Sequence, residues 1–202
     1  LSGEIWLDEL RLTSVDDTPG WAYRFDTQIK LADLGTVSFN YSYVDPNFHT
    51  LEQRFGSRQL STNWGVSASM QAEKLLDEAW SGTTIPLSFS HTENMAKPRY
   101  LPNSDVLVSE ASTQTREKII RSGGTTEEAQ AAADQIVLES ETRRVTDTYA
   151  APNFRLNLPS DAWYIRDTFN KLNFGFTYTK SSERSPSVVR RVTWSWNARI
   201  AY

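Results

Sequence analysis

The stretch that decides the fold runs from Trp21 to Leu31 and reads Trp-Ala-Tyr-Arg-Phe-Asp-Thr-Gln-Ile-Lys-Leu. Apolar or aromatic residues take nearly every odd position, whereas charged or amide side chains take the even positions from Arg24 to Lys30. Successive side chains of a β-strand point to opposite faces, so this pattern predicts one apolar and one polar face. A strand placed between lipid and a water-filled lumen has this composition.

The same alternation returns in five more segments, which predicts six strands arranged in three hairpins. These segments are residues 36–43, 63–73, 84–90, 171–179 and 191–202.

Two details of the predicted hairpins depend on single residues. Gly35 ends the short turn after Leu31 and is able to take positive φ, because glycine does so without steric cost. Pro86 lies inside the fourth predicted strand and lacks an N–H group, so a bulge or a weakly paired position is expected there. A further turn is expected over residues 181–189, which contain Ser185-Pro186.

The alternation assigns side chains to two sets. The lipid-facing set is rich in rings and branched aliphatic groups, and it comprises Tyr23, Phe25, Ile29, Phe39, Tyr41, Val66, Leu87, Phe89, Leu172, Phe174, Phe176, Val192, Trp194, Trp196 and Ile200. The lumen-facing set is short or charged, and it comprises Arg24, Asp26, Gln28, Ser38, Asn40, Ser67, Ser69, Ser88, Asn173, Thr177, Ser195 and Asn197.

Between residues 94 and 167 the alternation stops, which predicts a long, partly helical insertion. Residues 104–121 are compatible with a helix, and Gly123-Gly124 ends it. Thr125 and Glu128 have the spacing of a capping box, so a second helix is expected over residues 129–141.

The predicted organisation of the chain has four parts. They are a strand of an adjoining β-domain with a linker (1–18), barrel strands 1–4 (19–93), the insertion (94–167) and barrel strands 5–6 (168–202).

Composition excludes several classes of protein and site. The chain has 202 residues, a formal net charge of -4 and no cysteine, so disulfides and thiolate metal sites are excluded. A mean hydropathy of -0.52 and the lack of a run of about 18 apolar residues argue against a transmembrane helix. The acidic balance does not favour a nucleic-acid partner.

Alternation alone fits a soluble β-sandwich as well as a membrane barrel, because both have strands with one buried face. Three features favour the barrel: strands longer than the usual 5–6 residues of soluble sheets, many Trp and Tyr on one face, and a small polar opposite face. Six strands are too few to close a lipid-spanning barrel. The chain is therefore expected to be all-β, a fragment that forms an arc of a large antiparallel transmembrane β-barrel with one helix-containing insertion.

The sequence does not present a catalytic, metal or cofactor constellation. His49 and His91 lie far apart and without metal-ligand spacing, so both are interpreted as surface histidines. Neither a phosphate-binding loop nor a nucleophile motif occurs. We therefore expect a protein that is not an enzyme and that has no cofactor. The alternative function is a soluble cell-surface β-sandwich binding module, with a glycan bound through exposed tryptophans as one form of it.

Three stretches, Gly3–Thr13, Ile29–Thr36 and Leu51–Arg54, resemble the SprA/Sov family of outer-membrane translocons. These proteins serve the type IX secretion system of the Bacteroidetes group and, in some members, gliding motility. The resemblance implies a very large single-chain barrel in the cell outer membrane, through which folded secreted cargo passes.

The resemblance also implies partners. They are outer-membrane lipid, the secreted cargo, a PorV-type barrel, a periplasmic plug and the remaining strands of the same barrel. Outer-membrane barrels have short periplasmic turns, so the turn at residues 32–35 is expected on the periplasmic side and the insertion outside.

Overall fold

A computed structural model describes residues 18–53 and 56–202. Over these residues the chain forms one open sheet of seven antiparallel strands, and each strand pairs with the next one along the chain. The strands are β1 (Ala22–Leu31), β2 (Gly35–Val44), β3 (Gln59–Gln71), β4 (Pro86–Pro98), β5 (Thr142–Phe154), β6 (Asn173–Ser185) and β7 (Val188–Ala201).

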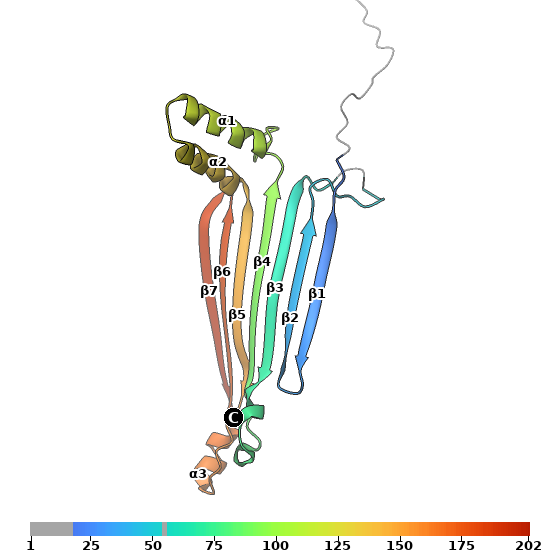
Figure 1. Cartoon of the computed structure of the whole chain (residues 1–202). Coiled ribbons are helices and arrows are strands. Elements are labelled where there is room, and N and C mark those ends of the chain that lie inside the picture. The colour runs from blue at the N-terminus through green and yellow to red at the C-terminus, as the bar shows by residue number, and fades with distance from the viewer. Residues whose placement is uncertain (1–17, 54–55) are drawn as a thin grey trace, which may run out of the picture.

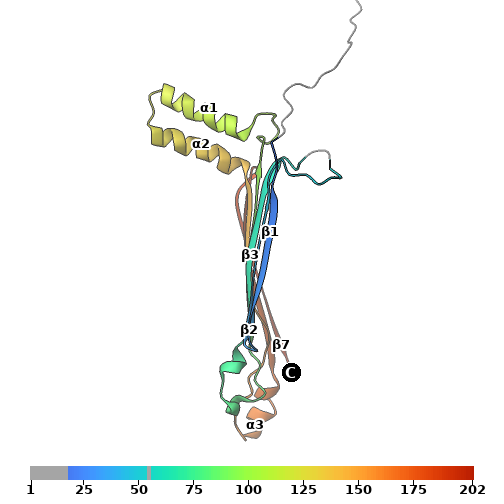
Figure 2. The same cartoon turned by 45° about the vertical axis from the view of Figure 1, so that its right-hand side comes forward.

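The sheet is a single layer, as the two views show (Figures 1 and 2). At about 3.3 Å per residue, strands of 10–14 residues reach the length that a tilted strand needs to cross a bilayer. The described residues contain no large side chain that is fully buried. A water-soluble β-sandwich requires a second sheet over the apolar residues, and the described part of the chain forms one sheet only.

A helical hairpin connects β4 to β5 at one end of the sheet (Figure 1). It consists of α1 (Val108–Arg121) and α2 (Thr126–Ser140), as the sequence predicts. Val108, Ala129 and Ala133 are the buried apolar residues of the described chain, so its small core lies in this hairpin. Figure 2 shows both helices projecting to one side of the thin sheet.

The predicted capping box at the start of α2 is confirmed. The Glu128 N–H donates to Thr125 Oγ1 at 3.2 Å, and the Thr125 N–H donates to Glu128 Oε2 at 2.8 Å.

We expect Thr125→Ala to destabilise the first turn of α2 by about 1 kcal/mol, because it leaves an N–H group without its acceptor. Hydrogen exchange of the α2 amides measures this loss. Thr126→Ala is the control, and equal exchange in both variants would contradict the capping role.

The prediction of six strands is wrong, because β5 lies within the range predicted to be an insertion. Thr142–Phe154 pairs with β4 on one side and with β6 on the other. In addition, β4 continues through Pro98 and β6 through Ser185, beyond their predicted ends. The turn between β6 and β7 is reduced to Pro186 and Ser187.

The bulge expected at Pro86 is absent, and the freedom of Gly35 to take positive φ is not used. Ala32, not Gly35, takes positive φ (50°) in the first turn. Gly35 is needed for space instead, because a Cβ built on it lies 2.2 Å from the Ser69 backbone oxygen of β3. Pro86 is the first residue of β4, where a strand tolerates proline, and the β3–β4 register is continuous.

The opposite end of the sheet carries the turn after β1 and two longer connections. The first contains η1 (Ala72–Leu75) and η2 (Glu78–Trp80), and the second contains α3 (Trp163–Arg166) and η3 (Phe169–Lys171). Thr84 and Arg155 exchange two backbone hydrogen bonds of 2.8 Å, which ties the connections together.

The predicted strand over residues 3–13 lies outside the described residues. The division of the chain into an adjoining domain, barrel strands and an insertion stays a prediction.

Candidate functional site

The strand register sorts the side chains of the sheet onto two faces. Directly paired residues of antiparallel strands share a face, so the pairs Phe25–Tyr41 and Tyr41–Trp64 place three rings on the same side. We call this side the apolar face. The register places on it 14 of the 15 residues predicted to face lipid: Tyr23, Phe25, Ile29, Phe39, Tyr41, Val66, Leu87, Phe89, Phe174, Phe176, Val192, Trp194, Trp196 and Ile200. The remaining residue, Leu172, immediately precedes β6.

The opposite side, called here the polar face, carries every residue predicted to face the lumen. The register places on it Arg24, Asp26, Gln28, Ser38, Asn40, Ser67, Ser69, Ser88, Asn173, Thr177, Ser195 and Asn197. The structure thus brings together each set as a set. That one face contacts lipid and the other lines a lumen stays a prediction.

Rings on the apolar face contact each other across neighbouring strands. Tyr23 stacks on Tyr43 with ring centroids 4.9 Å apart, and Phe89 lies 5.0 Å from Tyr149. The outer strands leave their rings open, since Trp194 is 65% and Trp196 63% exposed. Exposed apolar side chains gathered on one face mark a surface that contacts another protein or a membrane.

Short hydroxyl and amide side chains lie side by side on the polar face. Thr146 lies 3.2 Å from Ser181 and Thr148 3.4 Å from Thr179 through their hydroxyl groups. Gly65 leaves room for Asn40, whose Oδ1 would lie 2.9 Å from a Cβ at this position. Side chains of this kind remain hydrated and offer little apolar surface to which another protein could adhere.

Charged residues interrupt the apolar face on β4, β5 and β6, and we call them the ion-pair cluster. Arg143 Nε donates to Glu93 Oε1 at 2.7 Å, and His91 Nδ1 lies 2.6 Å from Asp147 Oδ1. Glu141 accepts a hydrogen bond from Arg184 and lies 3.7 Å from Lys97 Nζ. Glu141 itself is buried, so this carboxylate depends on its two cationic partners.

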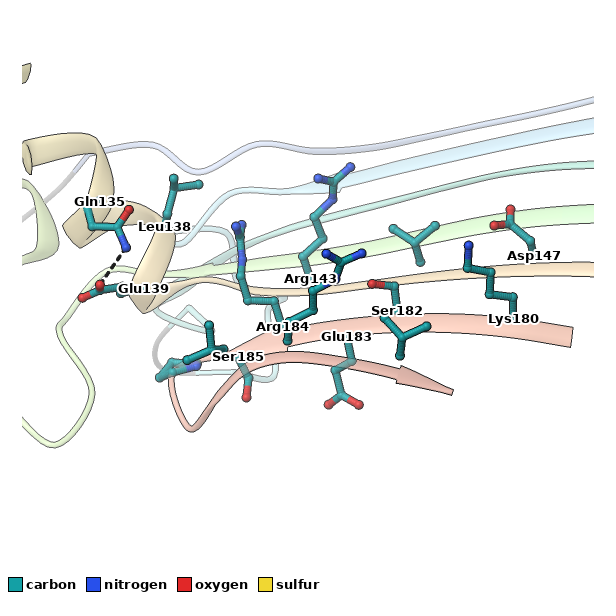
Figure 3. A pocket seen from close by; sticks show the side chains of 15 residues that line it. Gln135, Leu138, Glu139, Arg143, Asp147, Lys180, Ser182, Glu183, Arg184 and Ser185 are labelled. Carbon is teal, nitrogen blue, oxygen red and sulfur yellow. Dashed lines mark hydrogen bonds between the residues drawn. The ribbon is translucent and has the colours of Figure 1, made fainter. Parts of the chain in front are cut away.

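A cleft of about 700 Å³ lies between α2 and the apolar-face side of β5–β7. Figure 3 shows Arg143, Arg184 and Lys180 on one side of the ribbon and Glu183 on the other. Residues of α2, among them Leu138, line the side of the cleft opposite the sheet. The helical hairpin therefore projects over the apolar face and not over the polar face.

Sequence reasoning missed the cleft and the ion-pair cluster. It also missed Tyr149 of β5, a ring on the apolar face that contacts Phe89. The period-2 pattern of a strand was present in β5, because Val145 and Tyr149 lie on one face and Thr146 and Thr148 on the other. Charges on both faces of β5 hid this period.

The connection after β5 is fixed to the end of β7. The Tyr202 hydroxyl donates to the Asp167 carbonyl oxygen at 2.8 Å. Arg166 donates two hydrogen bonds to the Asp167 carboxylate, and this neighbour holds the pKa of that carboxyl below its usual range. The connection exposes Trp163, Tyr164 and Phe169 at this end of the sheet.

No helix in the described part of the chain combines the length and the apolar composition needed to traverse a bilayer. Residues 18–53 and 56–202 contain no group of three or more His, Asp or Glu side chains placed to hold a metal ion.

The comparison with known proteins identifies a family. A family profile, SprA_N, described as motility related/secretion protein, matches residues 1–111, which is more than half of the chain. No curated protein matches the chain. The matched range includes β1 to β4, and a role in motility or secretion suggests a protein associated with the cell envelope. The chain belongs to the SprA_N family of motility related/secretion proteins.

Proposed function

We propose that this sheet is a wall segment of a very large outer-membrane β-barrel that conducts folded proteins in type IX secretion and gliding motility. One observation carries the proposal. In the described part of the chain, a single layer of long strands separates a ring-rich face from a face of polar and charged side chains, without a core between two layers. Lipid on the apolar face and water on the polar face satisfy both faces at once.

The two edges of the sheet support the same proposal. Among residues 18–53 and 56–202, β1 and β7 each pair on one side only, so each leaves a row of backbone N–H and C=O groups without strand partners there. Such groups are costly within a bilayer, and a closed barrel pairs them. We infer that further strands of the same barrel continue the sheet at both edges. A PorV-type barrel and a periplasmic plug are the additional partners that the family resemblance implies.

The polar face suits passage of folded cargo and not catalysis. Its serine, threonine and asparagine side chains remain hydrated, and a surface of this kind does not hold a passing protein. The protein acts as a conduit without a cofactor, and its acidic balance does not favour nucleic acid. We place the α1–α2 end on the outer side of the membrane, opposite the turn at residues 32–34.

The chain lacks cysteine, so a single introduced cysteine tests the proposed conduit directly. We expect Ser67→Cys, on the polar face, to form a disulfide or a thiol cross-link with a secreted protein that is arrested during export. The adjacent Val66→Cys, on the apolar face, is expected to react poorly with water-soluble thiol reagents and to form no cargo adduct. Immunoblotting of the cross-linked protein in intact cells measures both outcomes.

Val66→Cys is a matched control, because the two positions are neighbours in β3 and differ only in the face that they occupy. Cargo adducts at Val66→Cys without adducts at Ser67→Cys would reverse the assignment of faces. Full reactivity of both positions in intact membranes would contradict a membrane wall altogether.

A further inference from the structure

The cleft under α2 combines cationic and apolar side chains within a short distance. Lys180, Arg184 and Arg143 come from the sheet, and Leu138 comes from α2 above them (Figure 3). Val145 and Val192 line the same space. A lining of this kind fits an amphiphile with an anionic head.

Two of the cations that line the cleft are not part of an ion pair within the described residues. Arg143 is paired with Glu93, and Arg184 with Glu141. In contrast, no ion pair of Lys180 or Arg190 occurs among the described residues.

The carboxylates that line the cleft are otherwise engaged or directed elsewhere. Asp147 lies directly opposite Lys180 in the strand register, but its carboxylate lies 2.6 Å from His91 and forms no ion pair with Lys180. Glu139 accepts a hydrogen bond from Gln135. Glu183 lies opposite Arg191 in the strand register, on the polar face, and Figure 3 shows Glu183 pointing away from Arg143 and Arg184. Charge complementarity therefore favours an anion beside Lys180 and Arg190.

The cleft lies where the apolar surface of the middle strands ends. On β4, β5 and β6 the aromatic residues nearest the cleft are Phe89, Tyr149 and Tyr178, which lie opposite each other in the register. Two residues further along these strands towards α2, the apolar face carries His91, Asp147 and Lys180 instead. This change from rings to charges marks the depth of lipid head groups if the apolar face contacts lipid.

The adjacent strand β7 behaves differently at the same height. Trp194 pairs directly with Lys180 and Val192 with Ser182, so apolar side chains continue beside the charged row. Below them Trp196 and Tyr178 extend the apolar surface. An acyl chain can thus follow β7 while its head group remains beside the cations.

We propose that the cleft binds a membrane lipid through its phosphate-bearing head group, with Lys180 and Arg190 as the phosphate ligands. Its acyl chains lie along Trp194 and Trp196, and α2 covers the head group. This inference rests on the proposed function, since it requires that the apolar face contacts lipid. It assigns one bound lipid to one place on that face.

Quenching of tryptophan fluorescence by brominated lipids tests the proposal on the detergent-purified protein. Phosphatidic acid with dibrominated acyl chains is compared with diacylglycerol that has the same chains and lacks the phosphate. We expect half-maximal quenching at about tenfold lower mole fraction for the phosphatidic acid, because two cations contribute to its binding. In the double variant K180Q/R190Q the two lipids should quench equally.

The control is the double variant R24Q/K30Q, which removes the same two residue types from the polar face. It should retain the preference for phosphatidic acid. Equal quenching by both lipids in the unmodified protein would overturn the lipid site while leaving the lipid-facing assignment intact. Quenching by neither lipid would overturn both.

Two further outcomes would overturn the proposal. Inorganic phosphate that displaces the brominated phosphatidic acid at millimolar concentration would assign the cleft to a free anion. The variant Ser182→Cys places a cysteine in the cleft. If a co-purifying protein shields this cysteine from thiol reagents in lipid-free detergent, the cleft binds a protein partner.

Discussion

Replacing Phe176 with arginine is expected to destabilise the membrane-inserted sheet by about 2–4 kcal/mol or to block its assembly. Phe176 lies on the apolar face, pairs with Ala151 and Ala198, and is 47% exposed. No carboxylate lies directly opposite on either neighbouring strand, so the new charge would enter lipid without a counter-ion. Phe39→Arg on β2 should behave in the same way, because Phe39 pairs with Thr27 and Val66.

Thr177→Arg and Ser38→Arg are the matched controls, one residue away on the same strands. Both positions lie on the polar face, where an arginine would point into water. We expect assembled protein at near-normal levels for the controls and its loss for the two apolar-face variants. The measurements are the protein recovered from outer membranes and its unfolding in denaturant. Equal effects on both faces would show that the facing assignment is wrong.

The period-2 pattern predicted much of the sheet because each of its faces has one chemical character. Tyr23, Phe25 and Ile29 alternate with Arg24, Asp26 and Gln28, and a pleated strand converts that order directly into two faces. The start of α2 was equally predictable, because the capping box from Thr125 to Glu128 depends on four consecutive residues.

The rest could not be predicted because it depends on residues distant in sequence. Arg143 meets Glu93 across 50 positions, and His91 meets Asp147 across 56. Read along the sequence alone, these charged residues are typical of a loop, because their partners on β4 are not apparent. They also interrupt the alternation of apolar and polar residues in β5. Gly35 is likewise required because the Ser69 backbone oxygen of β3 lies close to it. A turn rule based on neighbouring residues cannot predict this contact.

The buried Glu141 gives the second large expected effect. Its side chain is 5% exposed, accepts a hydrogen bond from Arg184 of β6 and lies 3.7 Å from Lys97 of β4. Its backbone N–H donates a hydrogen bond to the Val137 carbonyl oxygen at the C-terminal end of α2. One carboxylate thus joins the helical hairpin to two strands that are not adjacent in sequence.

Glu141→Ala is expected to cost about 2–3 kcal/mol of stability, less than a fully buried pair because solvent reaches both cations. Arg184 and Lys97 would be left beside each other without the charge that balances them. Hydrogen exchange should increase in α2 and in the neighbouring ends of β4 to β6, whereas β1 and β2 remain protected. Exchange that rises uniformly over the sheet would contradict a local role.

Two variants separate the charge of Glu141 from its hydrogen bond. Glu141→Gln keeps a carbonyl acceptor for Arg184 and should lose less stability than Glu141→Ala, because only the charge is removed. Glu139→Ala removes an exposed carboxylate whose partner is Gln135, so its effect should stay within about 0.5 kcal/mol. If Glu139→Ala matched Glu141→Ala, the loss of stability would not depend on Arg184 and Lys97, and the ion-pair cluster would not hold the hairpin over the apolar face.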